Sequence, residues 1–139
     1  KFADDLSETI VRAAAAGVRQ IIADEGCADL WSPKVLRAAM GAHFLLHLHP
    51  AADLAAWRQT YREPLFATAL TANSTPLYHL NLRPPCAWLF GNEGGGLTAA
   101  ARNTATRTVK IPMSGATESL NVAMAATVCL FEQLRQRSE

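Results

Sequence analysis

The sequence has little net charge, few cysteines and no long apolar run. Charged residues make up 18% of the 139 residues, and 13 Lys+Arg almost balance 12 Asp+Glu, which leaves a net charge of +1. Such a domain exerts no general attraction on polyanions, so a polyanionic partner must be recognised by a local patch. Hydrophobic residues account for 50% of the chain, and this content excludes intrinsic disorder.

The lack of long apolar runs and of paired cysteines also bears on the cellular location of the protein. No apolar stretch approaches the roughly 20 residues of a membrane-spanning helix, because Arg, Asp, His or Gly interrupts each run. The first residues are not followed by the apolar segment of a secretory signal. The three cysteines form no C-x-x-C pair. We therefore expect a soluble, cytoplasmic protein with no membrane partner.

Apolar runs alternate with turn signals along the whole chain. A chain of this length can bury roughly two-thirds of its unfolded surface, so residues 1–139 are expected to form one domain. Gly17 ends a helix, and Ser32-Pro33 opens one that Gly41 closes. The pattern predicts helices over residues 7–16, 33–41, 51–60, from 97, and 119–136, and strands over residues 18–23, 43–48, 65–70, 86–90 and 108–111.

Strands that alternate with helices predict an α/β fold with a parallel sheet covered on both faces. In such sheets, ligands bind beyond the carboxyl ends of the strands. Two segments at these ends are unusual enough to carry chemistry.

The first unusual segment is the glycine loop, residues 89–97, with the sequence L-F-G-N-E-G-G-G-L. Glycines allow a backbone to approach a ligand closely and to adopt positive φ angles. The spacing matches neither a P-loop nor the dinucleotide fingerprint G-x-G-x-x-G. On its own, such a loop is more simply explained as an ordinary strand-to-helix turn.

The second unusual segment covers residues 111–125, with the sequence I-P-M-S-G-A-T-E-S-L-N-V-A-M-A. It combines a strand end, a small polar loop and a helix that we expect to open at Ser119. Taken alone, Ser119 and Asn121 would be helix caps with no ligand.

Together, these two segments resemble motifs 2 and 3 of the SpoU (TrmH-like) family of RNA ribose methyltransferases. Residues 26–42 are similar to the family's G-x-x-x-x-x-x-P-K-x-x-R-A-x-x-G-A segment, and the resemblance spans residues 7–137. It implies a SPOUT-type α/β knot, in which the C-terminal part of the chain passes through a loop to form a trefoil. It also implies a homodimer with the first and last helices at its interface and an active site shared across it.

The resemblance further implies a cofactor, S-adenosylmethionine, bound in the knot mainly by backbone groups. Its contacts fall on Gly91, Ile111 and Leu120, with Met113 adding an apolar face and Thr71 and Asn92 as neighbours. Two loop backbones flanked by apolar side chains suit an adenine ring.

The implied reaction is transfer of a methyl group to a ribose 2′-hydroxyl of rRNA or tRNA. The family assigns removal of the hydroxyl proton to an arginine that matches Arg12. A guanidinium group stays charged and is a poor proton acceptor, so we expect Arg12 to bind the RNA phosphate and stabilise the developing alkoxide. Glu93 could orient it bidentately, and Ser119 and Asn121 complete the implied catalytic set.

One motif departs from the family pattern. The family's N-x-G-x-x-x-R would place Asn and Gly where Leu6 and Glu8 stand, and the usual first strand is absent. Either the chain is a fragment or this member has lost part of its pocket. Two other interpretations therefore stay open, a non-catalytic RNA-binding module of the same fold and a generic α/β nucleotide-binding protein.

Basic and histidine side chains give weaker signals. Four basic residues lie near predicted N-terminal loops and helices, and we interpret them as a patch that faces RNA. The alternative is that they are scattered over a solvated surface. The histidines at positions 43, 47 and 49 have no carboxylate or cysteine at ligand spacing, so we expect no metal. The four basic residues are Arg12, Arg19, Lys34 and Arg37.

Overall fold

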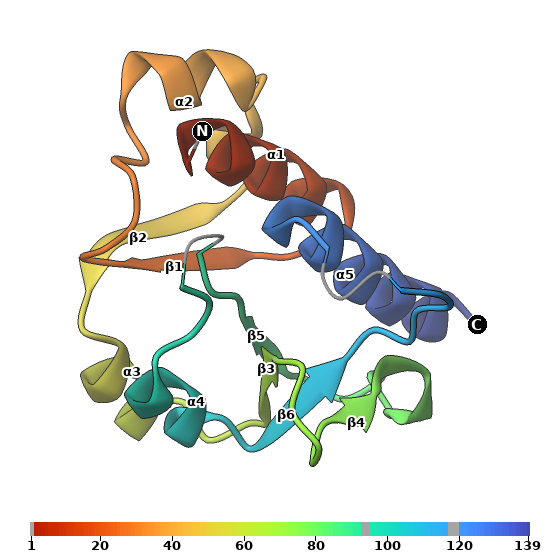
Figure 1. Cartoon of the computed structure of the whole chain (residues 1–139). Helices are drawn as coiled ribbons and strands as arrows, with labels where there is room; N and C mark the ends of the chain where they lie inside the picture. The colour runs from red at the N-terminus through yellow and green to blue at the C-terminus, as the bar shows by residue number, and fades with distance from the viewer. Residues whose placement is uncertain (1, 93–94, 117–119) are drawn as a thin grey trace.

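Parallel strands enclosed by helices make up the computed structural model, which describes residues 2–92, 95–116 and 120–139 (Figure 1). The helices are α1 (Phe2–Ala15), α2 (Pro33–Ala38), α3 (Leu54–Thr60), α4 (Ala99–Thr104) and α5 (Val122–Ser138), with single 3-10 turns η1 (Ala42–Phe44) and η2 (Leu77–His79). The strands are β1 (Gln20–Asp24), β2 (His47–Ala52), β3 (Leu65–Thr68), β4 (Thr75–Pro76), β5 (Ala87–Leu89) and β6 (Arg107–Lys110).

The strands form two parallel sheets. β1 pairs with β2, and the other four pair in the order β4-β6-β3-β5, with every pairing parallel. The predicted parallel α/β class is therefore confirmed. Because β3, β5 and β6 run in the same direction, their carboxyl ends meet at one edge of the sheet.

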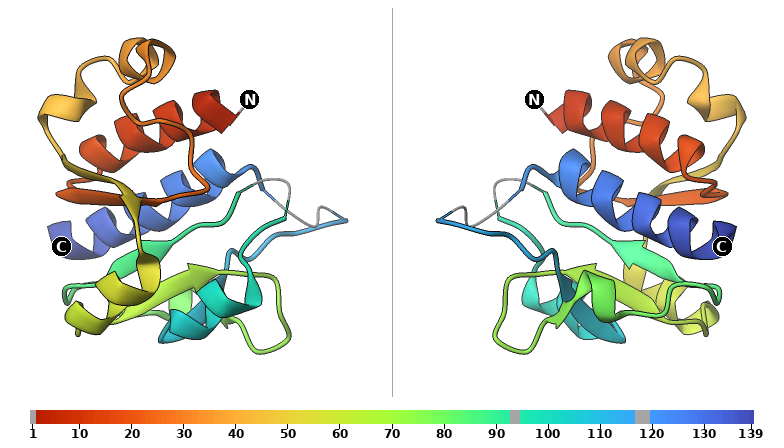
Figure 2. Two further views of the ribbon diagram at one scale, coloured as in Figure 1. Left: turned by 90° about the vertical axis from the view of Figure 1, so that its left-hand side faces the viewer. Right: turned by 90° about the vertical axis from the view of Figure 1, so that its right-hand side faces the viewer.

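Helix α5 lies between α1 and the four-stranded sheet, while α3 and α4 lie on the other side of that sheet (Figures 1 and 2). Toward α1, α5 buries Ala126 and Leu130 against Ala13 and Ala16. Toward the sheet it buries Cys129 in the cluster of Phe66, Leu77 and Val109. The small alanine side chains allow the two helix backbones to approach each other closely.

Buried amide side chains fix the position of α5 along the sheet. Gln136 donates from Nε2 to the Leu80 carbonyl at 3.1 Å and accepts from Leu82 N–H at 2.7 Å. Gln133 accepts a hydrogen bond from the Trp88 indole N–H at 2.9 Å. These bonds satisfy polar groups in an apolar setting, so sliding α5 along the sheet would leave them unpaired.

The predicted strand over residues 43–48 is wrong at its start. Residues 42–44 form a 3-10 turn after Gly41, whose φ is +84°. His43 is buried in that turn, and its Nε2 lies 2.6 Å from the Leu30 carbonyl oxygen. The apolar residues of this segment predict a strand, but the contact between His43 and Leu30 favours a turn.

The predicted starts of three helices are also wrong. β2 continues through Ala52, and α3 begins only after Asp53, whose Oδ1 accepts from Ala56 N–H at 3.1 Å. α1 already begins at Phe2, before Ser7. α5 begins at Val122 with Asn121 as its cap, whereas Ser119, the predicted cap, lies outside the described residues. Local capping patterns were available at several positions, and packing selected among them.

Candidate active site

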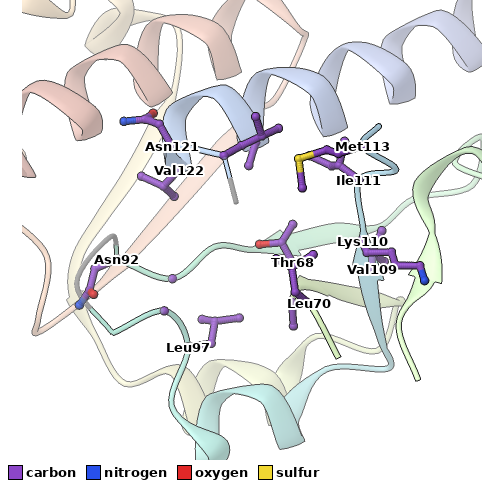
Figure 3. Close-up of a pocket in the computed structure, with 15 residues that line it drawn as sticks. Thr68, Leu70, Asn92, Leu97, Val109, Lys110, Ile111, Met113, Asn121 and Val122 are labelled. Atoms are coloured by element: carbon purple, nitrogen blue, oxygen red, sulfur yellow. The ribbon is translucent and has the colours of Figure 1, made fainter. Parts of the chain in front are cut away.

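A cavity of about 420 Å³ lies at the carboxyl edge of the four-stranded sheet, under the start of α5 (Figure 3). This volume is within the range typical of small-molecule sites. Four segments line it: the end of β3, the glycine loop, the end of β6 with the residues after it, and the start of α5. The lining residues are Thr68, Ala69, Leu70, Gly91, Asn92, Gly96, Leu97, Val109, Lys110, Ile111, Met113, Leu120, Asn121, Val122 and Ala125.

The glycine loop turns back on itself where it meets the cavity. Gly96 N–H donates to the Asn92 carbonyl at 2.9 Å, and Gly95 N–H donates to Asn92 Oδ1 at 2.9 Å. A Cβ added at Gly91 would lie against the backbone of Gly96 and 2.5 Å from Leu97 N, which is closer than real Cβ atoms come. Glycine is therefore required at position 91 by the close approach of the two halves of the loop.

Aromatic stacking holds the entrance to this loop. Phe90 stacks on Trp88 with ring centroids 6.1 Å apart and planes 12° from parallel. Trp88 is itself held by its hydrogen bond to Gln133 of α5. The glycine loop thus begins from a strand end that is tied to α5.

Asn121 combines a capping role with a place on the cavity wall. Its Oδ1 accepts hydrogen bonds from Ala123 N–H at 2.8 Å and from Met124 N–H at 3.2 Å. Asn121 and Val122 lie on the α5 side of the cavity, across from Leu97 and Leu70 (Figure 3). The capping bonds direct the amide oxygen to the helix, and they fix the backbone that lines the cavity.

The structure places most of the predicted cofactor contacts together. Gly91, Asn92, Ile111, Met113 and Leu120 all line the cavity, although they are separated by up to about thirty positions in the sequence. The pairing of β5 and β6 with β3 brings the loops after these two strands together. The two unusual loops of the sequence are therefore walls of one site.

Of the other predicted site residues, Asn121 lines the cavity, whereas Thr71 and Arg12 do not. Thr71 does not line the cavity, and its hydroxyl is 2.9 Å from Ser74 Oγ. Arg12 lies on α1 outside the lining set, 3.9 Å from Glu8 at the closest pair of charged atoms. Glu93 and Ser119 lie outside the described residues, so their predicted roles remain predictions.

The Arg12 guanidinium group is only partly accessible. Its side chain is 40% exposed, yet its Nε is buried without a hydrogen-bond partner in the described part of the chain. A shielded guanidinium nitrogen without an acceptor is costly. Arg102 Nε is in the same situation, so this feature does not by itself single out Arg12 as a functional residue.

Several cavity residues were missed by the sequence reasoning. Ala69 and Leu70 follow β3 directly, and Lys110 ends β6, with its side chain directed away from the centre of the cavity in Figure 3. The rule that ligands bind at the carboxyl ends of parallel strands would have found them, because both strands were predicted.

Other ligand classes have little support in the described residues. No group of three or more His, Cys, Asp or Glu side chains is arranged there to hold a metal ion. None of the helices in the described ranges has both the length and the apolar character needed to cross a membrane. The lining is instead largely apolar, with backbone amides and carbonyls from the loops.

By its fold and site, this is a parallel α/β domain with a small-molecule cavity at its strand ends. Residues 7–131 match the model of the SpoU rRNA Methylase family. The matched range includes all four segments that line the cavity. The chain therefore belongs to the SpoU rRNA methylase family.

Individual relatives agree with this assignment. The chain is 40% identical over 133 residues to an "uncharacterized tRNA/rRNA methyltransferase" of Synechocystis sp., with 93% of this chain and 48% of the relative covered. It is 34% identical over 135 residues to a 23S rRNA (guanosine-2′-O-)-methyltransferase of Vibrio parahaemolyticus, with 96% and 55% covered. The chain thus spans about half the length of these curated relatives.

A solved structure shows the same fold. The SpoU methyltransferase AviRb of Streptomyces viridochromogenes, in complex with its cofactor S-adenosylmethionine (AdoMet), superposes with a TM-score of 0.88 at 30% identity. The superposition covers 98% of this chain and 56% of AviRb.

Proposed function

We propose that this chain is the catalytic domain of an enzyme that transfers a methyl group from AdoMet to a ribose 2′-hydroxyl of rRNA or tRNA. The observation that carries the proposal is the single cavity lined by both the glycine loop and the segment that leads into α5. Membership in the SpoU family and the AdoMet complex of AviRb support the same activity.

The residues present fit AdoMet. Ile111, Leu97 and Leu120 offer apolar faces to an adenine ring, and the backbones at Gly91 and Met113 offer amide donors and acceptors. AdoMet supplies a methyl group that is already activated, so the protein must mainly position the hydroxyl and assist loss of its proton. The tightly folded glycine loop and the capped start of α5 are the rigid elements on which such positioning depends.

Arg12 is the proposed residue for RNA phosphate binding and for stabilising the developing alkoxide, with Glu93 orienting it and Ser119 and Asn121 completing the site. The Arg12 side chain is 40% exposed, which suits contact with a partner molecule. Arg12 does not line the cavity of its own chain. A homodimer that brings Arg12 of one copy to the cavity of the other is therefore part of the proposal.

The surface of α5 is compatible with this homodimer. Met124 and Phe131 of α5 are 49% and 40% exposed, so this helix offers apolar side chains to a second copy. The trefoil knot is proposed together with the dimer, with support from the TM-score to AviRb. A cytoplasmic location follows from the proposed RNA substrates and suits the free thiols of Cys27, Cys86 and Cys129.

A second candidate is an RNA-binding module of the same fold without transfer activity. Leu6 packs against a buried cluster of α1 and β1, and Glu8 forms an ion pair with Arg12 at 3.9 Å. The residues that stand in place of the family's Asn and Gly thus have structural partners, and Glu8 competes for the guanidinium. This observation favours the module if Arg12 cannot be released to RNA.

Two measurements test these functions. Calorimetry should show micromolar binding of AdoMet, with ATP and NAD as control ligands for a generic nucleotide-binding protein. Incubation with tritiated AdoMet and total RNA should label a ribose 2′-oxygen, located by nucleotide mapping. Binding without labelled RNA would select the non-catalytic module, and stronger binding of ATP or NAD would reject the methyltransferase.

A further inference from the structure

The cavity wall after β3 rests on backbone contacts. Ala69 N–H donates to the Val109 carbonyl at 3.0 Å, which continues the pairing of β3 with β6 for one more residue. The next residue, Leu70, lines the cavity but is 59% exposed. Packing alone therefore does not hold Leu70, and its position depends on how the backbone on either side of it is fixed.

A buried serine fixes the other side of this wall. Ser74 is 6% exposed, and its Oγ donates to the Ala69 carbonyl at 2.7 Å. The same Oγ accepts from Thr71 N–H at 3.2 Å and lies 2.9 Å from Thr71 Oγ1. A serine hydroxyl has one hydrogen to donate, so the Thr71 hydroxyl must be the donor in the last contact. All the hydrogen-bonding capacity of the Ser74 hydroxyl is thus satisfied. Its bonds to Ala69 and Thr71 hold the residues immediately before and after Leu70.

We propose that Ser74 is a positioning residue that sets the affinity for AdoMet by holding the wall formed by Ala69 and Leu70. The inference rests on the proposed function, because it assigns that wall to the AdoMet site. Ser74 does not itself line the cavity, and it acts through the backbone of Ala69 and Thr71.

The remaining walls are held by other contacts. The glycine loop is closed by the bonds of Gly95 and Gly96 to Asn92, and the start of α5 is fixed by Asn121. Loss of the Ser74 hydroxyl leaves these contacts in place. The expected effect is therefore on cofactor affinity, and the rate at saturating AdoMet should change little.

A matched control is available at the opposite end of the same strand. Thr106 Oγ1 accepts from Leu65 N–H at 3.0 Å and from Arg58 Nη2 at 3.2 Å, where β3 begins. Thr106→Ala therefore removes a hydroxyl that also holds β3, and Thr106 does not line the cavity. If Ser74 only stabilised the fold, Ser74→Ala and Thr106→Ala should both lower stability and leave the affinity for AdoMet unchanged.

The experiment measures AdoMet binding by calorimetry, methyl transfer to RNA at varied AdoMet, and thermal unfolding of the full chain. Ser74→Ala should raise the Kd and the KM for AdoMet about fivefold or more, which corresponds to about 1 kcal/mol, with kcat within about twofold of wild type. Thr106→Ala should lower the melting temperature and leave the Kd unchanged. Ser74→Thr, which keeps the hydroxyl, should restore most of the affinity.

The outcomes separate the two proposals. If wild-type protein binds AdoMet and Ser74→Ala binds it equally well, the role of Ser74 is refuted while the proposed function stands. If wild-type protein does not bind AdoMet, the proposed function fails and this inference fails with it. If Ser74→Ala does not fold, Ser74→Cys replaces it, because a thiol is a weak donor and acceptor, and an unchanged Kd in that variant overturns the inference.

Discussion

Replacing Gly91 by alanine tests the geometry of the glycine loop directly. The new Cβ would lie 2.5 Å from Leu97 N and against the backbone of Gly96, so backbone atoms would have to move. The two hydrogen bonds that close the loop onto Asn92 would be disrupted. At about 0.5–1.5 kcal/mol for each hydrogen bond, the variant should lose about 1–3 kcal/mol of stability.

The same movement should reduce cofactor binding. Gly91, Asn92, Gly96 and Leu97 all line the cavity, so opening the loop displaces one complete wall. We expect the Kd for AdoMet, measured by calorimetry, to rise about tenfold or more, and the midpoint of urea unfolding to fall.

Gly95→Ala is the control in the same loop. A Cβ at Gly95 would lie 3.9 Å from Asn92 Oδ1, which is an ordinary contact distance. Its free energy of unfolding should stay within about 1 kcal/mol of wild type. If Gly91→Ala were as stable as Gly95→Ala and bound AdoMet as tightly as wild type, the steric argument for position 91 would be refuted.

Three further predictions concern residues of α5: the cap Asn121, the buried Gln133 and the acidic Glu132. Asn121→Ala should cost about 1 kcal/mol through loss of the helix cap and should slow methyl transfer tenfold or more; Asn121→Asp, which can restore the cap, separates the two effects if only stability recovers. Gln133→Leu should cost about 1–3 kcal/mol in urea unfolding, because the Trp88 indole N–H is left unpaired, and an unchanged midpoint would contradict this account. The hydrogen bond from Arg135, followed by the one from Gln136, lowers the pKa of Glu132 from 4.5 to about 2, so its stabilisation is present above about pH 4.5 and is lost as the pH falls toward 2. Glu132→Gln should therefore weaken the acid dependence of stability between those two values, as measured by urea midpoints across that range.

Local pattern was sufficient for the main strands and for the two unusual loops. The apolar runs that became β3, β5 and β6 are bounded by proline, glycine or polar residues, and each run was placed within a few residues of the observed strand. The glycine loop and the segment before α5 follow two of these strands, so their position at the carboxyl edge could be predicted from chain order alone.

Boundaries that depend on contacts between distant residues could not be predicted in this way. His43 forms part of a buried turn because it reaches the carbonyl of Leu30, and no local periodicity reports that bond. Asn121 rather than an earlier residue caps α5, although several polar residues there could cap a helix. The two-residue strand β4 is too short to leave a pattern, and it forms because it pairs with β6.

By itself, the sequence determined the parallel α/β class, the family and the two loops that line the cavity, because these depend on residue types and spacings within short segments. Only the tertiary structure decided that the Thr71 hydroxyl contacts Ser74 and does not line the cavity. The same holds for the position of Arg12 outside the cavity of its own chain. The physical reason is that a hydrogen bond or a wall between distant segments is set by how strands and helices pack, and the order of residues does not record that geometry.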